Sequence, residues 1–257
     1  MTLLSRIVFS AATAWVFALT SATARAQSVD ELRTKGAVFD QRFEAGEALK
    51  FYLAAEKLDP KDARTLVAIA RQYRYQMADA TGKDEKLRLG RIALGYSQRA
   101  AALAPNDAEA QLSVAITYGK MLPFLGSREQ VDASPRIKKS VDAALRLDPR
   151  NDTAWHILGR WHRVLADVSS LKRILAGAIY GSLPQGSNEA AAKALEKAIA
   201  FNPNRLMHYL ELGRVYAQMG RKDEARKFIN KGLGMPNLEK DDPETKARGR
   251  EALEKLH

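Results

Sequence analysis

Two pairs of arginines are the residues of this 257-residue sequence best suited to bind something: Arg71 with Arg74, and Arg160 with Arg163. A guanidinium group makes paired hydrogen bonds to carboxylate or phosphate groups. The whole sequence carries 41 Lys and Arg against 30 Asp and Glu, a formal charge of +11. An electrostatically steered partner of such a chain should be acidic.

Catalytic and metal-binding patterns are missing from the sequence. It has no cysteine, which excludes a disulfide, a cysteine-ligated zinc site and a cysteine nucleophile. His156 and His162 lie six residues apart, whereas two histidines that share a zinc on one helix need a spacing of four. The Gly-x-Ser-x-Gly and Gly-Lys-Ser/Thr motifs are also absent. We therefore expect a protein that is not an enzyme and that needs no metal or cofactor.

The N-terminus has the features of a secretory signal. Arg6 precedes an apolar stretch over residues 7–19, and Ala24-Arg25-Ala26 offers the small-residue pattern that signal peptidase cleaves. We predict a signal peptide over residues 1–26, cut before Gln27, and a periplasmic protein of a Gram-negative bacterium. The alternative is a retained membrane anchor, although a bilayer-spanning helix needs about 20 apolar residues.

The rest of the sequence is predicted to be helical, with no run of alternating β-branched residues long enough for a strand. Alanine-rich amphipathic stretches are each closed by a proline, which stops a helix. These prolines are Pro60, Pro105, Pro149, Pro203 and Pro236, at intervals of 45, 44, 54 and 33 residues.

The spacing of small and large residues resembles the 34-residue tetratricopeptide repeat. Leu212, Gly213 and Tyr216 occupy repeat positions in the last unit, and Leu158 and Gly159 repeat them one unit earlier. The glycines should let two helices cross closely. We predict an all-α fold, an α-solenoid of about five helix pairs with insertions between helices and a C-terminal capping helix. The repeat domain covers 27–257, with units at 29–62, 63–107, 108–151, 152–205 and 206–239 and the terminal helix at 243–257.

Two longer stretches resemble one particular family of such proteins. Residues 84–107 and 152–198 keep the order and length of the insertions found in the regulators of microtubule dynamics, and the resemblance runs from Arg64 to Leu256. It implies a tetratricopeptide-like fold and a binding role. Microtubule or membrane-contact roles of eukaryotic members would not transfer to a periplasm, which has no microtubules.

In the tetratricopeptide repeat, set positions of each first helix face a concave groove. Their occupants include six cations, one tyrosine and one histidine, whereas the acidic residues in the same set are Asp30, Asp40 and Glu109. The alternative is that a chain this basic places some arginines there by chance. The predicted groove residues are Arg71, Arg74, Tyr75, Lys120, His156, Arg160, Arg163 and Arg214.

These observations predict a groove that binds an acidic or C-terminal peptide segment of a partner protein. The alternative is binding or transfer of an anionic phospholipid, with the arginines on the headgroup and the apolar insertion at 171–183 shielding the chains. Export argues against nucleic acid, which charge alone would favour.

Overall fold

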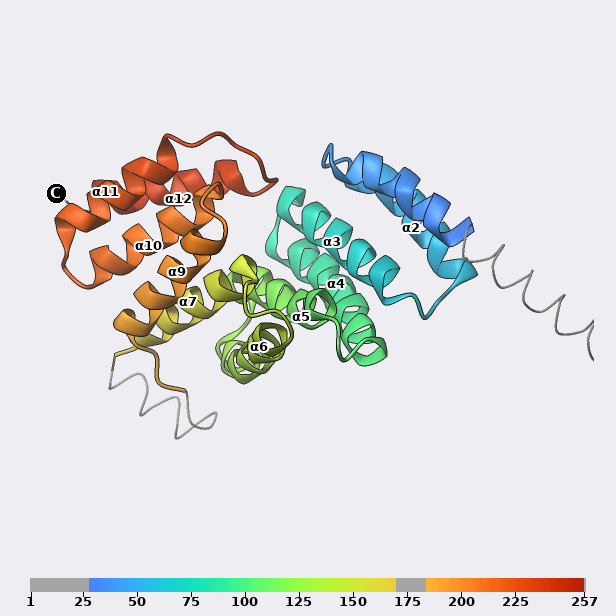
Figure 1. The fold of residues 1–257 in the computed structure, drawn as a ribbon, viewed down its shortest axis with the longest axis horizontal. Helices are drawn as coiled ribbons and strands as arrows, with labels where there is room; N and C mark the ends of the chain where they lie inside the picture. The colour runs from blue at the N-terminus through green and yellow to red at the C-terminus, as the bar shows by residue number, and fades with distance from the viewer. Residues whose placement is uncertain (1–27, 170–183, 257) are drawn as a thin grey trace, which may run out of the picture.

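The computed structural model describes residues 28–169 and 184–256. Every regular secondary-structure element within these ranges is a helix. The chain forms an arch, with its first and last helices at the two ends (Figure 1). The predicted signal peptide and the 171–183 insertion lie outside the described residues. Within the described ranges, no helix is long and apolar enough to cross a membrane.

Successive helices pair as antiparallel neighbours, which confirms the predicted α-solenoid of helix pairs. Residues 28–40 are helical and precede α2. The other elements are α2 (Ala45–Leu58), α3 (Ala63–Asp79), α4 (Lys83–Leu103), α5 (Ala108–Met121), the 3₁₀ turn η1 (Leu122–Phe124), α6 (Ser127–Leu147), α7 (Asp152–Ala166), α9 (Asn188–Phe201), α10 (Leu206–Gln218), α11 (Lys222–Leu233) and α12 (Asp242–Glu254).

Three of the repeat units begin with a side-chain cap. Asp62, Asp107 and Asn151 each lie two residues after a predicted helix-stopping proline, and each accepts a hydrogen bond from a backbone N–H in the first turn of α3, α5 or α7. Such a cap satisfies a donor that the helix itself leaves unpaired. The Pro-x-Asp/Asn sequence therefore ends one repeat and starts the next.

The extra residues of the second and third units lengthen helices. Helices α4 and α6 each have 21 residues, whereas α2 and α9 have 14. The predicted insertions at these places are therefore additional helical turns at the N-terminal ends of α4 and α6.

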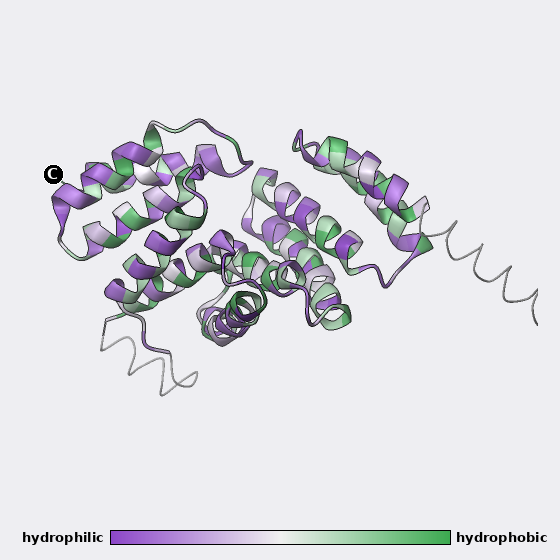
Figure 2. Cartoon of the chain, in the orientation of Figure 1, coloured by the Kyte–Doolittle hydropathy of each residue, from purple (hydrophilic) through white to green (hydrophobic). Residues whose placement is uncertain are grey.

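Small residues allow close packing within the last two units, as predicted. A Cβ atom on Gly159 would lie 2.6 Å from Leu195 Cγ, and one on Gly213 would lie 2.6 Å from Ile229 Cγ1. Hydrophobic residues lie along the sides of the helices that face their neighbours (Figure 2). The positions of α7 and α10, which bear on the candidate site, are thus fixed by contacts that leave no room for a larger side chain.

The C-terminal region does more than cover the last repeat. Helix α12 packs on α10 and α11, while the segment before it crosses to the α3 side of the arch (Figure 1). There Lys240 Nζ lies 2.8 Å from Asp79 Oδ1 at the end of α3, and Asp241 pairs with Lys120 of α5. This segment therefore joins the fifth unit to the second and third.

Candidate binding groove

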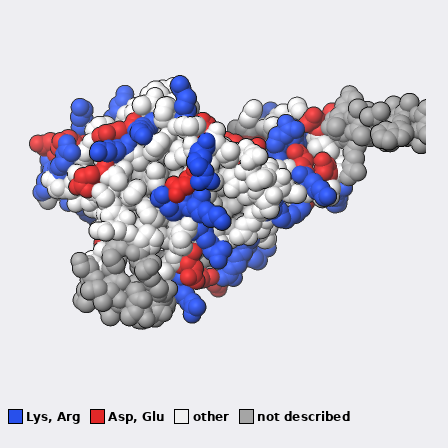
Figure 3. All heavy atoms as spheres, turned by 60° about the horizontal axis from the view of Figure 1, so that its bottom comes forward, with Lys and Arg blue, Asp and Glu red and all other residues white. Residues whose placement is uncertain are grey.

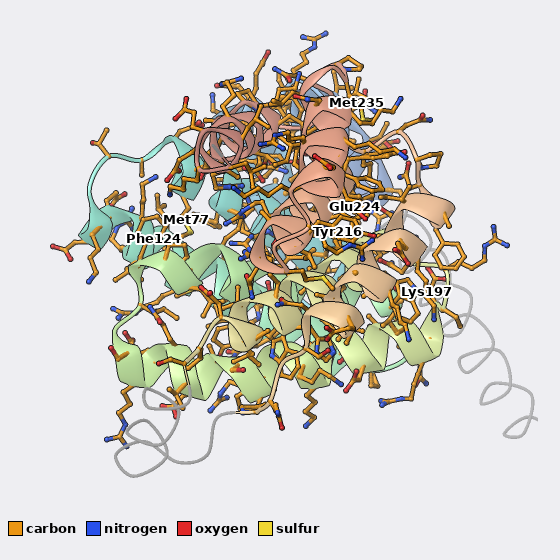
Figure 4. The ribbon with its side chains drawn as sticks, turned by 90° about the vertical axis from the view of Figure 1, so that its left-hand side faces the viewer. Met77, Phe124, Lys197, Tyr216, Glu224 and Met235 are labelled. Carbon is orange, nitrogen blue, oxygen red and sulfur yellow. The ribbon has the colours of Figure 1, made fainter. Side chains whose placement is uncertain are left out.

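A cavity of about 760 Å³ lies between the inner helices of the arch and the C-terminal segment. Its walls come from α3, α5, α7, α10 and residues 239–248. Met77 and Phe124 also line it and lie close together in Figure 4. Of the eight predicted groove residues, only Arg163 does not line it. The seven that do are Arg71, Arg74, Tyr75, Lys120, His156, Arg160 and Arg214.

Arg71 is held by an acidic residue of the preceding unit. Its Nη2 atom lies 2.6 Å from Asp40 Oδ2, and Asp40 also accepts a hydrogen bond from the Tyr52 hydroxyl at 3.3 Å. Burial by itself would lower the pKa of Arg71, but the Asp40 carboxylate outweighs it and the pKa is raised. Arg71 therefore lines the cavity with its charge already balanced by Asp40.

Arg74 is buried among hydroxyl groups. Its Nη1 atom donates to Ser113 Oγ at 3.1 Å and to Thr117 Oγ1 at 3.0 Å, and both hydroxyls also contact Ser97. Burial and the nearby charge of Arg71 lower the pKa of Arg74 to about 10, so it stays charged at neutral pH. These hydroxyl groups stabilise the guanidinium group by hydrogen bonding but, because they are neutral, they do not balance its charge.

Tyr75 and Lys120 complete this end of the cavity. The Tyr75 ring makes an edge contact with Phe43, with ring centroids 5.8 Å apart. Lys120 pairs with Asp241, and burial lowers the pKa of its ammonium group. Both predicted residues thus touch other side chains of the chain itself.

Around α7 the charges are arranged differently, because two arginines share one buried carboxylate. Glu211 of α10 accepts from Arg163 Nε at 2.7 Å through one oxygen and from Arg214 Nη1 at 3.0 Å through the other. Burial would raise the pKa of Glu211, but Arg163, Arg214 and Arg160 hold it far below its usual range. Glu211 stays ionised, and both of its oxygens are already used.

Arg160 lies one turn before Arg163 and lines the cavity. It makes no hydrogen bond or ion pair with any residue in 28–169 or 184–256. Burial and the charges of Arg248, Arg214 and Arg163 lower its pKa, although Glu211 partly opposes them. Three arginines therefore surround one glutamate, and this part of the cavity keeps an excess of positive charge.

A buried chain of polar groups lies beside this cluster. His156 Nδ1 is 3.2 Å from His208 Nδ1, and His208 Nε2 is 2.9 Å from Asp152 Oδ2. Asp152 also accepts from Arg205 Nη1 at 2.6 Å, and these hydrogen bonds lower its pKa to about 2. His156 and His208 are 52 residues apart, so no local spacing in the sequence could have paired them. Among the described residues, no group of three or more His, Asp or Glu side chains is arranged to hold a metal ion.

The acidic residues of the cavity differ from those expected. Of Asp30, Asp40 and Glu109, only Glu109 lines it, and Glu211 joins from α10. The C-terminal segment supplies Glu239, Asp241, Asp242 and Glu244, so six acidic side chains face nine basic ones. The cavity therefore keeps an excess of basic side chains but contains more acidic ones than the repeat positions alone indicated. The acidic run at 239–244 between two predicted helices was the signal available in the sequence.

Positive charge is not confined to the cavity. A band of Lys and Arg runs down the middle of the face shown in Figure 3, with smaller groups of Asp and Glu beside it. Any test of the cavity therefore needs a control cation elsewhere on the surface.

The fold is similar to solved tetratricopeptide repeat structures. A thermophilic repeat protein of Thermus thermophilus superposes with a TM-score of 0.63 at 18% identity, covering 88% of this chain and 98% of that one. The pilF protein of Pseudomonas aeruginosa superposes with a TM-score of 0.55, also at 18% identity, covering 91% of this chain and 94% of that one. At this identity the likeness concerns the fold alone.

Sequence comparison connects the chain to a narrower group. It is 26% identical to regulator of microtubule dynamics protein 1 of Mus musculus over 83% of this chain and 71% of that protein. The Caenorhabditis elegans protein 1 is 23% identical over 85% and 98%. Protein 2 of Mus musculus is 25% identical, and the match spans 52% of its length. The model of the family described as regulator of microtubule dynamics protein 1-3 matches residues 26–257. The resemblance predicted from the sequence is confirmed, and the chain belongs to this family.

Proposed function

We propose that the chain is a non-enzymatic, exported binding module whose cavity takes an acidic or C-terminal segment of a partner protein. The observation that carries this proposal is Arg160, which lines the cavity and has no carboxylate or hydrogen-bond partner within the part of the chain that the structure describes. The Arg160 guanidinium is half-buried, and all its N–H donors remain available to a ligand. An anionic group would accept charge-assisted hydrogen bonds from them.

The lining suits a segment with both charged and apolar side chains. Phe43, Leu112 and Phe124 line the same cavity as the arginines. An anionic phospholipid would also match this mixture of charge and apolar surface, and it is the second candidate. A peptide is favoured because paired, semi-buried polar groups occupy much of the wall, whereas an acyl chain needs a continuous apolar one.

The experiment measures binding of fluorescently labelled hexa-aspartate by anisotropy. The Arg160→Gln variant should bind at least tenfold more weakly than the wild type, because a hydrogen bond to a charged group contributes about 1.5–3 kcal/mol. Wild-type binding should also weaken with added salt. The matched control is Arg64→Gln, since Arg64 is 72% exposed and does not line the cavity.

Equal loss in both variants would mean that net charge alone attracts the peptide and would contradict the proposal. Binding of phosphatidylglycerol vesicles without binding of the peptide would replace it with the lipid alternative. Because Arg160 has no internal partner, its substitution should leave the melting temperature nearly unchanged, which circular dichroism can check.

A further inference from the structure

The neighbours of the two buried histidines, His156 and His208, determine which ring nitrogen of each carries a proton. Asp152 is ionised and can only accept hydrogen bonds, so His208 Nε2, 2.9 Å away, must be the donor. The His208 ring is fully buried and His156 is 6% exposed, and burial lowers the pKa of both imidazoles. Both rings are therefore neutral, and each carries one proton.

The second proton follows from the first. A neutral His208 that is protonated on Nε2 has a lone pair on Nδ1. The nitrogen 3.2 Å from it, His156 Nδ1, must therefore be the donor. This leaves a lone pair on His156 Nε2, which has no hydrogen-bond partner among residues 28–169 and 184–256.

His156 and Arg160 present opposite hydrogen-bonding groups to the same cavity, which both residues line. They are four residues apart on α7, so their side chains are neighbours on one face of the helix. Arg160 can only donate, whereas His156 Nε2 can only accept. A ligand that satisfies both must carry an anionic oxygen with an N–H or O–H donor close beside it.

We propose, building on the proposed function, that His156 is a specificity residue that accepts a main-chain N–H of the partner segment while Arg160 binds the neighbouring carboxylate. An acidic residue in a peptide places its own amide N–H within a few bonds of its carboxylate. His208 acts as a positioning residue, because it sets the tautomer of His156 without lining the cavity. Arg205 and Asp152 hold His208 in turn.

The test compares labelled hexa-aspartate with the same peptide methylated on every main-chain nitrogen. The two have the same carboxylates, but the methylated peptide has no main-chain N–H. Wild type should bind the ordinary peptide about tenfold more tightly, the value of one hydrogen bond of about 1.4 kcal/mol. His156→Phe should lose this preference, whereas Arg160→Gln should weaken both peptides and keep it.

His208→Phe provides a readout that a purely structural role of His156 would not give. It leaves His156 in place but removes the acceptor for its Nδ1 proton, so the preference should fall while binding persists. Weaker binding of both peptides by the same factor, with the preference intact, would overturn the positioning role.

The wild-type comparison decides the main question even if a variant fails to fold. Equal wild-type affinity for the two peptides, or a preference that survives in folded His156→Phe, would overturn this inference and leave the proposed function standing. Absence of any binding of hexa-aspartate would overturn both.

Discussion

The two Arg-x-x-Arg pairs occupy the same repeat positions, but their guanidinium groups differ in the partners that the fold gives them. On α3, Arg71 is paired with Asp40 and Arg74 is buried against Ser113 and Thr117. On α7, only the second arginine, Arg163, is held by a carboxylate. Its neighbour Arg160 has no partner within the described residues.

The difference comes from the acids of neighbouring units. Asp40 ends the helix before α2 and meets α3 from the N-terminal side, whereas Glu211 on α10 meets α7 from the C-terminal side. Glu211 must also serve Arg214, so it cannot neutralise Arg160 as well. The repeat position of an arginine therefore predicts where it points, and the neighbouring unit decides whether it is available to a ligand.

Removing the acidic residue that pairs with the arginines of each region should give the largest difference in stability between the two regions. Glu211→Gln removes the buried carboxylate that pairs Arg163 and Arg214, whose side chains are only 11% and 28% exposed, and should lower the free energy of unfolding by about 3 kcal/mol. Asp40→Asn should cost about 1 kcal/mol or less, because Arg71 is 39% exposed and water replaces part of the lost interaction. Urea denaturation measures both. Similar losses would show that the two clusters are equally dependent on their acids.

The close helix crossing beneath the α7 pair can be tested separately. The residue before Arg160 is Gly159, whereas the equivalent residue of α3 is Ala70. Gly159→Leu would clash with Leu195 and with the Ala191 carbonyl and should cost about 1–3 kcal/mol. Gly95→Leu is the control, since a Cβ there meets nothing within 4 Å. If thermal melting shows Gly159→Leu to be as stable as wild type, α7 and α9 do not cross as described.

Acidification should affect the α7 region and spare the α3 region, which has no histidine. In the folded protein burial lowers the pKa of His156 and His208, whereas in the unfolded chain both titrate near 6.5. Below that pH the unfolded chain binds more protons, so stability falls as the pH falls.

Between pH 7.5 and 5.5 the loss should be about 1.4 kcal/mol for His156, whose pKa burial holds well below its usual value, and smaller for His208, where Asp152 opposes the effect of burial. Urea denaturation at both pH values measures it. A His156→Phe/His208→Phe double variant that folds should lose correspondingly less. An unchanged pH dependence in that variant would mean that the pair is not buried in its neutral form.

The smallest expected effect concerns the acidic segment that closes the α3 end. Asp241→Asn removes the partner of Lys120 and one negative charge from the cavity, so hexa-aspartate should bind about threefold more tightly, an effect of the size of one partly exposed ion pair. Asp223→Asn is the control, because Asp223 is 98% exposed on α11 and does not line the cavity. Equal gains would indicate a change in net charge only.

Two further proposals concern other segments of the chain. Export depends on the signal sequence at residues 1–26, and lipid binding depends on the apolar insertion at 171–183. Mass spectrometry of the protein purified from its own cells would test them together, since the N-terminal residue reports cleavage and a co-purifying phospholipid or protein reports the ligand.

The sequence by itself determined the helices and their order, because those depend on residues close together in the chain. Pro60, Pro105 and Pro149 stop helices by local sterics, and Asp62, Asp107 and Asn151 start the next ones by capping. The crossing at Gly159 was also predictable, since the repeat pattern places a small residue there. Seven of the eight predicted residues line one cavity for the same reason: helical periodicity alone sets which face a side chain occupies.

Only the tertiary structure decided which of those residues keep an unpaired charge. Arg163 meets Glu211 across 48 residues, Lys120 meets Asp241 across 121, and His156 meets His208 across 52. Each contact depends on how far the arch curves, which is the sum of many small packing angles between helices. Ion pairs and hydrogen bonds form only between groups that lie a few ångströms apart. Which of them form therefore depends on that curvature and cannot be obtained from spacing along the chain.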